Sequence, residues 1–387
     1  MSLSRIKTYE FIKKNYLNTN FYSTLCNKFS TSFSGHISLN EEIKYLNKGT
    51  WGFIFKVELK NKKFIKIKIQ ILPNSDFSNF KRLNDPRDID TEKFIFKESS
   101  KLVLNNITCN LPLFYNDIIC SEKKYDSIMF ITELSDNTFT NWILKTHSNL
   151  EWESFIFQIL SSFFVFKKYL KFFHNDINAD NILYNYDKNN GYYNYKINNT
   201  DYYLPTTGYI FLLWDYANGK SLLLNNKNEE ETKKNLNNNE DFITFNDIFI
   251  LMKMNNLFNS MSFENLKEKL KRKKLKSYTN YFNKELKKKK NKFKNEKINF
   301  KRRKKIKRSM HKSLCYFAIE NKLYDYIMEQ NIKNYEYNIL PSKKILNLIN
   351  NIFVNDKNLK IYEIIDKYFK KFKKKPKENL ILQTFIQ

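Results

Sequence analysis

The chain has 387 residues, of which 42% are hydrophobic and 17% aromatic, and it carries a formal net charge of +28. An apolar fraction this high excludes wholesale disorder, and the length is sufficient for a sizeable core with an extension. Residues 1–14 are mixed polar and charged, and no apolar run approaches the roughly 20 residues of a bilayer span, so neither a signal peptide nor a transmembrane segment is expected.

The first motif in chain order is a pair of glycines between two apolar stretches. Residues 46–57 read LNKGTWGFIFKV, in which Gly49 and Gly52 match the second and third glycines of G-x-G-x-x-G-x-V and Asn47 stands in the place of the first. Glycine permits close backbone approach and positive φ, so two strands joined by such a turn can lie over nucleotide phosphates. An ordinary hairpin turn is the alternative.

Residues 64–69 alternate strictly and predict a strand, with isoleucines on one face and Phe64, Lys66 and Lys68 on the other. One of the two lysines is expected to reach the α- and β-phosphates of ATP. Lys66 is favoured, because Phe64 then supplies an apolar roof for adenine. Lys68 remains a candidate, and a solvated charged face is the alternative for whichever lysine is not used.

A helix and a strand are predicted next. Residues 97–104 have helical spacing, and Glu98 is the preferred partner of the phosphate lysine, with Glu92 second and a surface glutamate as the alternative. Residues 127–134 are typical of a strand that runs into a connecting segment. The backbone groups of Glu133, Leu134 and Ser135 are expected to meet the adenine edge.

The most informative segment is HNDINADNIL, which follows an apolar stretch at residues 155–173 that predicts a buried helix. His174, Asp176 and Asn181 fit the spacing H-x-D-x-x-x-x-N of a phosphoryl-transfer loop. In such a loop the aspartate accepts or orients the proton of the attacking hydroxyl, and the asparagine holds Mg²⁺. A chance match in an Asn-rich chain is the alternative.

The second metal ligand is expected at Asp215. Residues 209–214 read as a buried strand that ends at Asp215-Tyr216-Ala217, in the position of D-F-G, whose aspartate chelates Mg²⁺. Residues 186–207 predict an elongated hairpin before that strand, and residues 221–240 a short or mobile segment. Asp241 or Asp247 is a candidate to brace the catalytic loop, with a helix N-cap as the simpler interpretation.

The positive charge is concentrated between Lys267 and Arg308, where 22 Lys and Arg residues face three glutamates, a net charge of +19. This basic arm is expected to bind nucleic acid or an anionic membrane surface, or to be a solvated lysine-rich excursion. The codon usage of an AT-rich genome is an alternative source of part of this basicity. Residues 314–327, 345–353 and 361–369 predict further helices.

The cysteines are four, dispersed along the chain without paired metal spacing: Cys26, Cys109, Cys120 and Cys315. This pattern predicts neither a disulfide framework nor a zinc site. It favours a reducing, intracellular compartment, cytoplasmic or nuclear.

Taken in order, these motifs resemble those of a eukaryotic-type protein kinase over roughly residues 39–257, and their divergences resemble the serine/threonine kinases of large nucleocytoplasmic DNA viruses. The resemblance implies an α+β fold of two lobes, a small antiparallel sheet lobe and a larger, mainly helical lobe, with ATP and Mg²⁺ between them. It implies transfer of the γ-phosphate to a serine or threonine hydroxyl of a protein. The expected divisions are an N-terminal extension (1–38), an N-lobe (39–134), the first part of a C-lobe (135–260), a basic insertion (261–310) and a helical completion of the C-lobe (311–387).

The sequence departs from the family pattern inside the catalytic loop. Asn175 replaces the usual arginine, Asn178 stands where serine/threonine kinases keep a lysine, Ala217 replaces the DFG glycine, and no A-P-E follows Asp215. Small-molecule phosphotransferases of the aminoglycoside and choline type also lack that lysine and are an alternative. A pseudokinase scaffold that binds a polyanion through the basic arm is another, although it has no need of the metal ligands.

Overall fold

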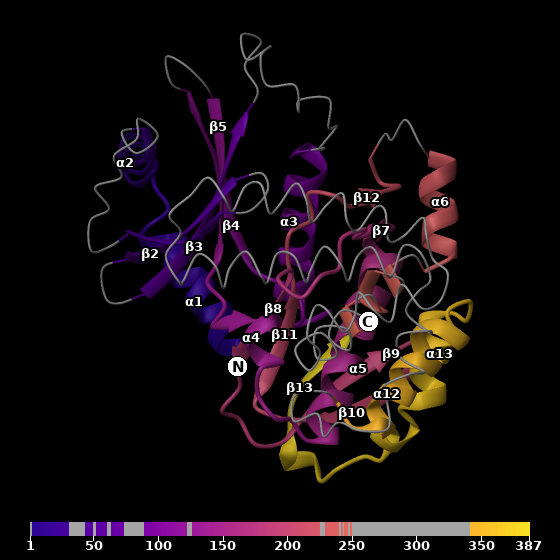
Figure 1. Ribbon diagram of the computed structural model, residues 1–387. Coiled ribbons are helices and arrows are strands. Elements are labelled where there is room, and N and C mark those ends of the chain that lie inside the picture. Colours follow the sequence, from indigo (N-terminus) through magenta and orange to yellow (C-terminus); the bar gives the residue numbers. More distant parts are fainter. Residues whose placement is uncertain are drawn as a thin grey trace, which may run out of the picture. The chain divides into compact units, whose positions relative to one another are not determined.

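The computed structural model (Figure 1) describes residues 2–30, 43–48, 52–59, 63–72, 89–121, 126–224, 229–239, 241–242, 244–246, 248–249 and 341–387. The chain divides into two compact units, Met1–Thr244 with Pro341–Gln387, and Phe245–Leu340. Within the second unit the rings of Phe245 and Phe249 meet edge to face. Every element below belongs to the first unit. The basic arm and the helix predicted at residues 314–327 lie outside the described residues.

A five-stranded antiparallel sheet occupies the amino-terminal part, in the order β1-β2-β3-β5-β4. The strands are β1 (Ile43–Lys48), β2 (Gly52–Leu59), β3 (Lys63–Leu72), β4 (Phe114–Ser121) and β5 (Asp126–Glu133). The strands predicted at residues 64–69 and 127–134 are therefore confirmed.

Both faces of this sheet are covered, because alternate residues of each strand point to opposite sides. On one face α3 (Ile89–Leu104) packs Phe96 against Phe114 and Phe130. On the other face Met129, Ile131 and their neighbours on β2 and β3 form a buried cluster with Ile12 and Leu25. The strands therefore show apolar residues on both faces at their centre.

Two amino-terminal helices, α1 (Ser2–Asn15) and α2 (Thr19–Ser30), cover that second face of the sheet. Ile12 of α1 is fully buried, and Leu25 of α2 is 2% exposed. Tyr9 stacks on Tyr115 of β4 with ring centroids 5.3 Å apart. The amino-terminal extension is thus part of the core of the first unit.

A buried helix forms the centre of the remaining part. α5 (Asn149–Val165) begins at a capping box in which Ser148 and Glu151 exchange hydrogen bonds, and it continues as a π-helical turn, Phe166–Leu170. The helix predicted over residues 155–173 is confirmed as far as Leu170. Phe172–Phe173 instead form β7, which pairs with β12 (Lys220–Ser221).

Two three-stranded sheets contain most of the strands that follow this helix in the chain, and the first of them flanks the HNDINADNIL loop. β8 (Ile182–Tyr186) pairs with β11 (Tyr209–Leu213) and with β6 (Asn137–Thr138). β9 (Tyr192–Ile197) and β10 (Thr200–Pro205) form the hairpin predicted within residues 186–207. β13 (Ile381–Ile386) adds to β9 in parallel. The expectation that the carboxy-terminal residues are helical is wrong for this strand.

Further α-helices include α4 (Phe139–Trp142), α6 (Glu229–Asn237), α12 (Lys343–Asn350) and α13 (Ile361–Tyr368), and α12 continues as a π-helical turn, Asn351–Asn355. α12 and α13 confirm the helices predicted at residues 345–353 and 361–369. α6 lies within the stretch expected to be short or mobile. The class is therefore mixed α+β with mostly antiparallel strands. In the described part of the chain, no helix combines the length and apolarity needed to cross a bilayer.

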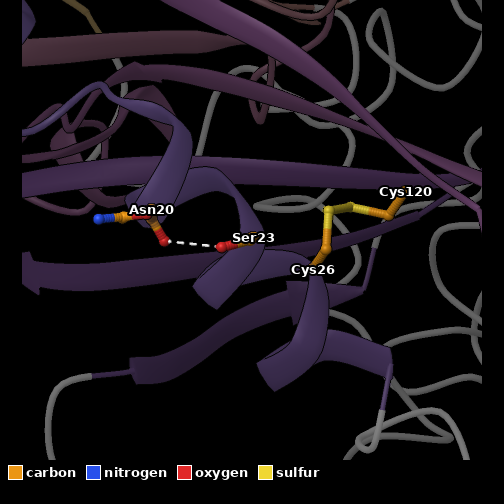
Figure 2. The surroundings of a disulfide bond; sticks show 4 residues. All are labelled: Asn20, Ser23, Cys26 and Cys120. Carbon is orange, nitrogen blue, oxygen red and sulfur yellow. Dashed lines mark hydrogen bonds between the residues drawn. A yellow bond between two sulfur atoms is a disulfide. The ribbon is translucent and has the colours of Figure 1, made fainter.

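Figure 2 shows a disulfide between Cys26 of α2 and Cys120 of β4, whose Cα atoms are 5.5 Å apart. The expectation of no disulfide is therefore wrong. The two residues are 94 apart in sequence, so their spacing gave no sign that the fold brings them together. Because disulfides persist in oxidising surroundings, the cysteines no longer favour a reducing compartment.

Candidate functional site

Asp241 holds the start of the HNDINADNIL loop through hydrogen bonds to its backbone. The backbone N–H of His174 donates to both carboxylate oxygens of Asp241, at 2.9 and 3.0 Å, and the N–H of Asn175 donates to Oδ1 at 2.9 Å. Asp241 is 7% exposed, and hydrogen bonds to an ionised acceptor are among the stronger ones. Asp241 is therefore the bracing aspartate of the two predicted candidates. Asp247 lies outside the described residues.

The same loop is joined to the end of β11 through Trp214. His174 Nε2 donates to the carbonyl oxygen of Trp214 at 2.9 Å, and the Trp214 N–H donates to the carbonyl oxygen of Asn181 at 2.9 Å. Since a carbonyl only accepts, the fully buried His174 ring carries its proton on Nε2. Asp215 follows Trp214 directly, so these two bonds place it beside the loop.

The backbone is left-handed at two residues of the site. Asn175 has φ 60° and Asp215 has φ 68°, a region that residues other than glycine adopt uncommonly and that clusters at functional sites. The buried Tyr216 fixes the second of these residues, because its hydroxyl donates to the Leu213 carbonyl at 2.9 Å and its ring lies 4.8 Å from that of Phe96. Burial raises the pKa of Tyr216, so this phenol stays neutral.

Asp176 is surrounded by side-chain amides. Asn178 Nδ2 donates to Oδ1 of Asp176 and Asn218 Nδ2 donates to Oδ2, each at 3.1 Å. Asn181 Nδ2 donates to the main-chain oxygen of Asp176 at 2.9 Å. The predicted pair Asp176 and Asn181 is therefore in direct contact. All three donors are neutral amides, and those of Asn178 and Asn218 orient the carboxylate.

Asn218 is a member of the site that the sequence did not reveal. Besides its bond to Asp176, its carbonyl oxygen accepts from Asn175 Nδ2 at 3.3 Å, which ties the segment after Asp215 to the catalytic loop. Its only signal in the sequence is its place three residues after Asp215. In a chain so rich in asparagine, that signal does not stand out.

Lys66 lies on the face of β3 that carries α3, opposite Thr132 of β5. Its side chain is nearly buried, and Nζ lies 3.5 Å from the centre of the Trp214 ring, a cation–π contact. Lys66 therefore lies against the residue that precedes Asp215. The side chain of Lys68 is outside the described part of the chain, so the structure gives a position only for the preferred lysine.

The two glutamates of α3 have different surroundings. Glu98 is at the surface, where its Oε1 accepts from Lys101 Nζ at 2.6 Å. Glu92 is fully buried, and its charge is one of the causes, after burial, that raise the pKa of Tyr216. Glu92 is one helical turn before Phe96, whose ring lies 5.0 Å from Trp214. Burial favours Glu92 over Glu98 as the partner of Lys66, and the pairing itself stays a prediction.

Glu133 is the last residue of β5, where the connector to the following residues starts, and its side chain makes structural contacts. Its carboxylate accepts from Leu113 N–H at 2.8 Å and from the guanidinium of Arg5, and its own N–H donates to the Leu113 carbonyl at 2.9 Å. The N–H of Glu133 is thus engaged by Leu113. Within the described residues no hydrogen bond engages the backbone of Leu134 or Ser135.

The two predicted glycines fall at the edge of what is described. Gly52 begins β2 and pairs with Gln70 of β3, whereas Gly49 lies outside the described residues. For the metal, no group of three or more His, Cys, Asp and Glu residues in the described part could hold an ion. Mg²⁺ needs fewer protein ligands, because it retains waters and binds phosphate oxygens. One carboxylate, Asp215, and one amide oxygen, Asn181 Oδ1, suit that mode of binding.

Comparison with known proteins gives no family for this chain. No protein-family model matches the sequence, and no curated protein matches it.

Proposed function

We propose that the chain is an ATP- and Mg²⁺-dependent kinase of the two-lobed protein-kinase type, which transfers the γ-phosphate to a serine or threonine hydroxyl of a protein. The observation that carries the proposal is a pair of hydrogen bonds at Trp214, whose carbonyl accepts from His174 Nε2 and whose backbone N–H donates to the carbonyl of Asn181. These bonds join the residue before Asp215 to the loop that carries Asp176, which supports the proposal that a carboxylate suited to a metal and a carboxylate suited to a proton belong to one site.

The fold supports the proposal in its arrangement. A five-stranded antiparallel sheet with α3 between β3 and β4 precedes the connector, and a region of helices and small sheets with the HNDINADNIL loop follows it. Lys66 of the sheet contacts Trp214 of the following region. The two regions therefore meet at the residues of the site.

The side chains divide the work as follows. Asp176 accepts a hydrogen bond from the acceptor hydroxyl and takes its proton as the phosphoryl group is transferred. Asn178 and Asn218 hold both carboxylate oxygens of Asp176 in one orientation. Lys66 would bind the α- and β-phosphates, with Glu92, the buried acid of α3, as its proposed partner. Asn181 and Asp215 would hold Mg²⁺, which would neutralise the charge of the phosphates, and bound ATP would supply the phosphoryl group.

The test is transfer of labelled phosphate by a D176N variant, with D180N as its control. Asp180 belongs to the same loop but is exposed, and its carboxylate accepts from Thr140 Oγ1 at 2.6 Å. Loss of a positioned base is expected to lower turnover by about 100- to 10,000-fold. D180N is expected to stay close to wild type, and nucleotide binding is expected to survive in both variants. Unchanged turnover of D176N would remove the basis of the assignment.

A second candidate is a phosphotransferase that acts on a small hydroxyl compound. It is favoured by Asn178, because an amide rather than a lysine contacts the carboxylate where serine/threonine kinases keep a cation. Labelled ATP offered with protein acceptors and, in parallel, with amino-alcohol and aminoglycoside acceptors separates the two. Label in protein supports the first candidate, and label in the small acceptor supports the second.

A further inference from the structure

Arg5, in the first turns of α1, makes a set of buried contacts that the proposed mechanism does not use. Its side chain is 7% exposed. Nε donates to Glu133 Oε2 at 3.0 Å and Nη2 donates to the other carboxylate oxygen, so the pair is bidentate. Nη1 also donates to the carbonyl of Cys109 at 2.6 Å, and Nη2 to that of Leu111 at 2.7 Å. One guanidinium therefore joins α1, the start of the connector and the segment before β4.

Asn110, the residue between Cys109 and Leu111, connects this segment to β11, the strand that leads to Asp215. Asn110 is fully buried, and its Nδ2 donates to the Phe211 carbonyl at 3.0 Å, while its own carbonyl accepts from the Leu213 N–H at 3.2 Å. Both partners belong to β11, which leads to Trp214 and Asp215. The segment that Arg5 holds is thus the one that holds β11.

These contacts are not needed to attach α1 to the sheet. Ile12 is fully buried, Tyr9 stacks on Tyr115, and the disulfide fastens α2 to β4. A buried ion pair is weak evidence for stability, because the desolvation of two charges offsets most of their attraction. An apolar residue at position 5 would attach α1 to the sheet as well as Arg5 does. The fork, meaning the four contacts that the Arg5 guanidinium makes with Glu133, Cys109 and Leu111, therefore requires a different explanation.

We propose that Arg5 is a positioning residue of the nucleotide site. The proposal rests on the kinase assignment above. The fork fixes the carboxylate of Glu133 and, with Leu113, the start of the connector whose next two residues meet adenine. A planar guanidinium can bind two carboxylate oxygens and two carbonyls at once, whereas a lysine ammonium at this site cannot reproduce that geometry.

The test compares R5K and I12A with the wild-type full chain. R5K keeps the charge and loses the fork, whereas I12A loosens α1 against the sheet without touching Arg5, and so controls for destabilisation alone. The KM for ATP is expected to rise about tenfold in R5K with kcat within about twofold, the pattern of a lost ground-state contact. I12A is expected to keep the wild-type KM even where its melting temperature falls further.

A double variant keeps the test decisive if R5K folds poorly. R5M with E133Q removes both buried charges, which avoids an unpaired carboxylate, and it is expected to fold and still to bind ATP more weakly than wild type. If wild type binds ATP and every Arg5 variant binds it equally well, the positioning role is overturned and the kinase assignment stands. If wild type binds no ATP, the kinase assignment itself fails.

Discussion

Reduction of the Cys26–Cys120 disulfide is expected to destabilise the first unit while leaving it folded. The bond closes a loop of 94 residues. For a loop of that length the chain-entropy estimate of the stabilisation is about 4.7 kcal/mol, and measured values are more often about 2–4 kcal/mol. The helix that the disulfide fastens has other attachments, because Leu25 is buried in the sheet cluster and Tyr22 accepts a hydrogen bond from Asn116 at 2.7 Å. These attachments are expected to keep α2 in place after reduction.

The assay is urea unfolding followed by tryptophan fluorescence, with and without a dithiol reductant. All four tryptophans, Trp51, Trp142, Trp152 and Trp214, lie in the first unit, so the signal reports on that unit alone. The midpoint is expected to fall on reduction in wild type and in a C109A control. In the double variant C26S/C120S, the urea midpoint is expected to be low both with and without reductant.

The number of cysteines that react with an alkylating reagent tests the disulfide independently of the unfolding data. Denatured, unreduced protein is expected to incorporate two alkyl groups, on Cys109 and Cys315, and reduced protein four. Four groups before reduction, or equal midpoints for oxidised and reduced wild type, would refute the reasoning.

Three further predictions concern the candidate site and the buried thiol. E92Q is expected to lower the rate of phosphate transfer about tenfold or more, whereas E98Q, which loses only a surface pair with Lys101, is expected to be near wild type in the same assay. D241N weakens the brace under His174 and is expected to reduce kcat more than the KM for ATP, as steady-state kinetics would measure. Burial raises the pKa of Cys109 to about 11 from 9.0, so native protein at pH 8 is expected to resist alkylation there in peptide mass analysis. Because the folded form keeps this proton longer than the unfolded form, the stability that Cys109 contributes is expected to be lost as pH rises from 9 to 11.

Local patterns predicted much of the fold and of the site. Strict alternation indicated β3, and the fixed spacing of His174, Asp176 and Asn181 gave the loop without reference to distant residues. The choice between Glu92 and Glu98 was beyond such patterns, because both lie on one helix and only tertiary packing decides which of them is buried. A short apolar run such as residues 381–386 is equally compatible with helix and strand.

Contacts between distant residues could not be predicted at all. Arg5 and Glu133 are 128 residues apart, and nothing in the neighbourhood of either indicates the other. The same holds for the disulfide. Asn218 was hidden for a different reason, since composition alone supplies many asparagines.

The parallel pairing of β13 with β9 has a consequence for the order in which the protein is made. β9 lies between the catalytic loop and β11, whereas residues 381–387 are synthesised long after both. At about 5–20 residues per second, β9 would wait on the order of 10 to 40 s for its neighbour on the ribosome. Until then it presents an unpaired strand edge, which is prone to associate with other chains. Gln387 completes the arrangement, since its N–H donates to the Lys196 carbonyl and its Nε2 to Ser161 Oγ, so the first unit is expected to reach its final structure only after synthesis of these residues.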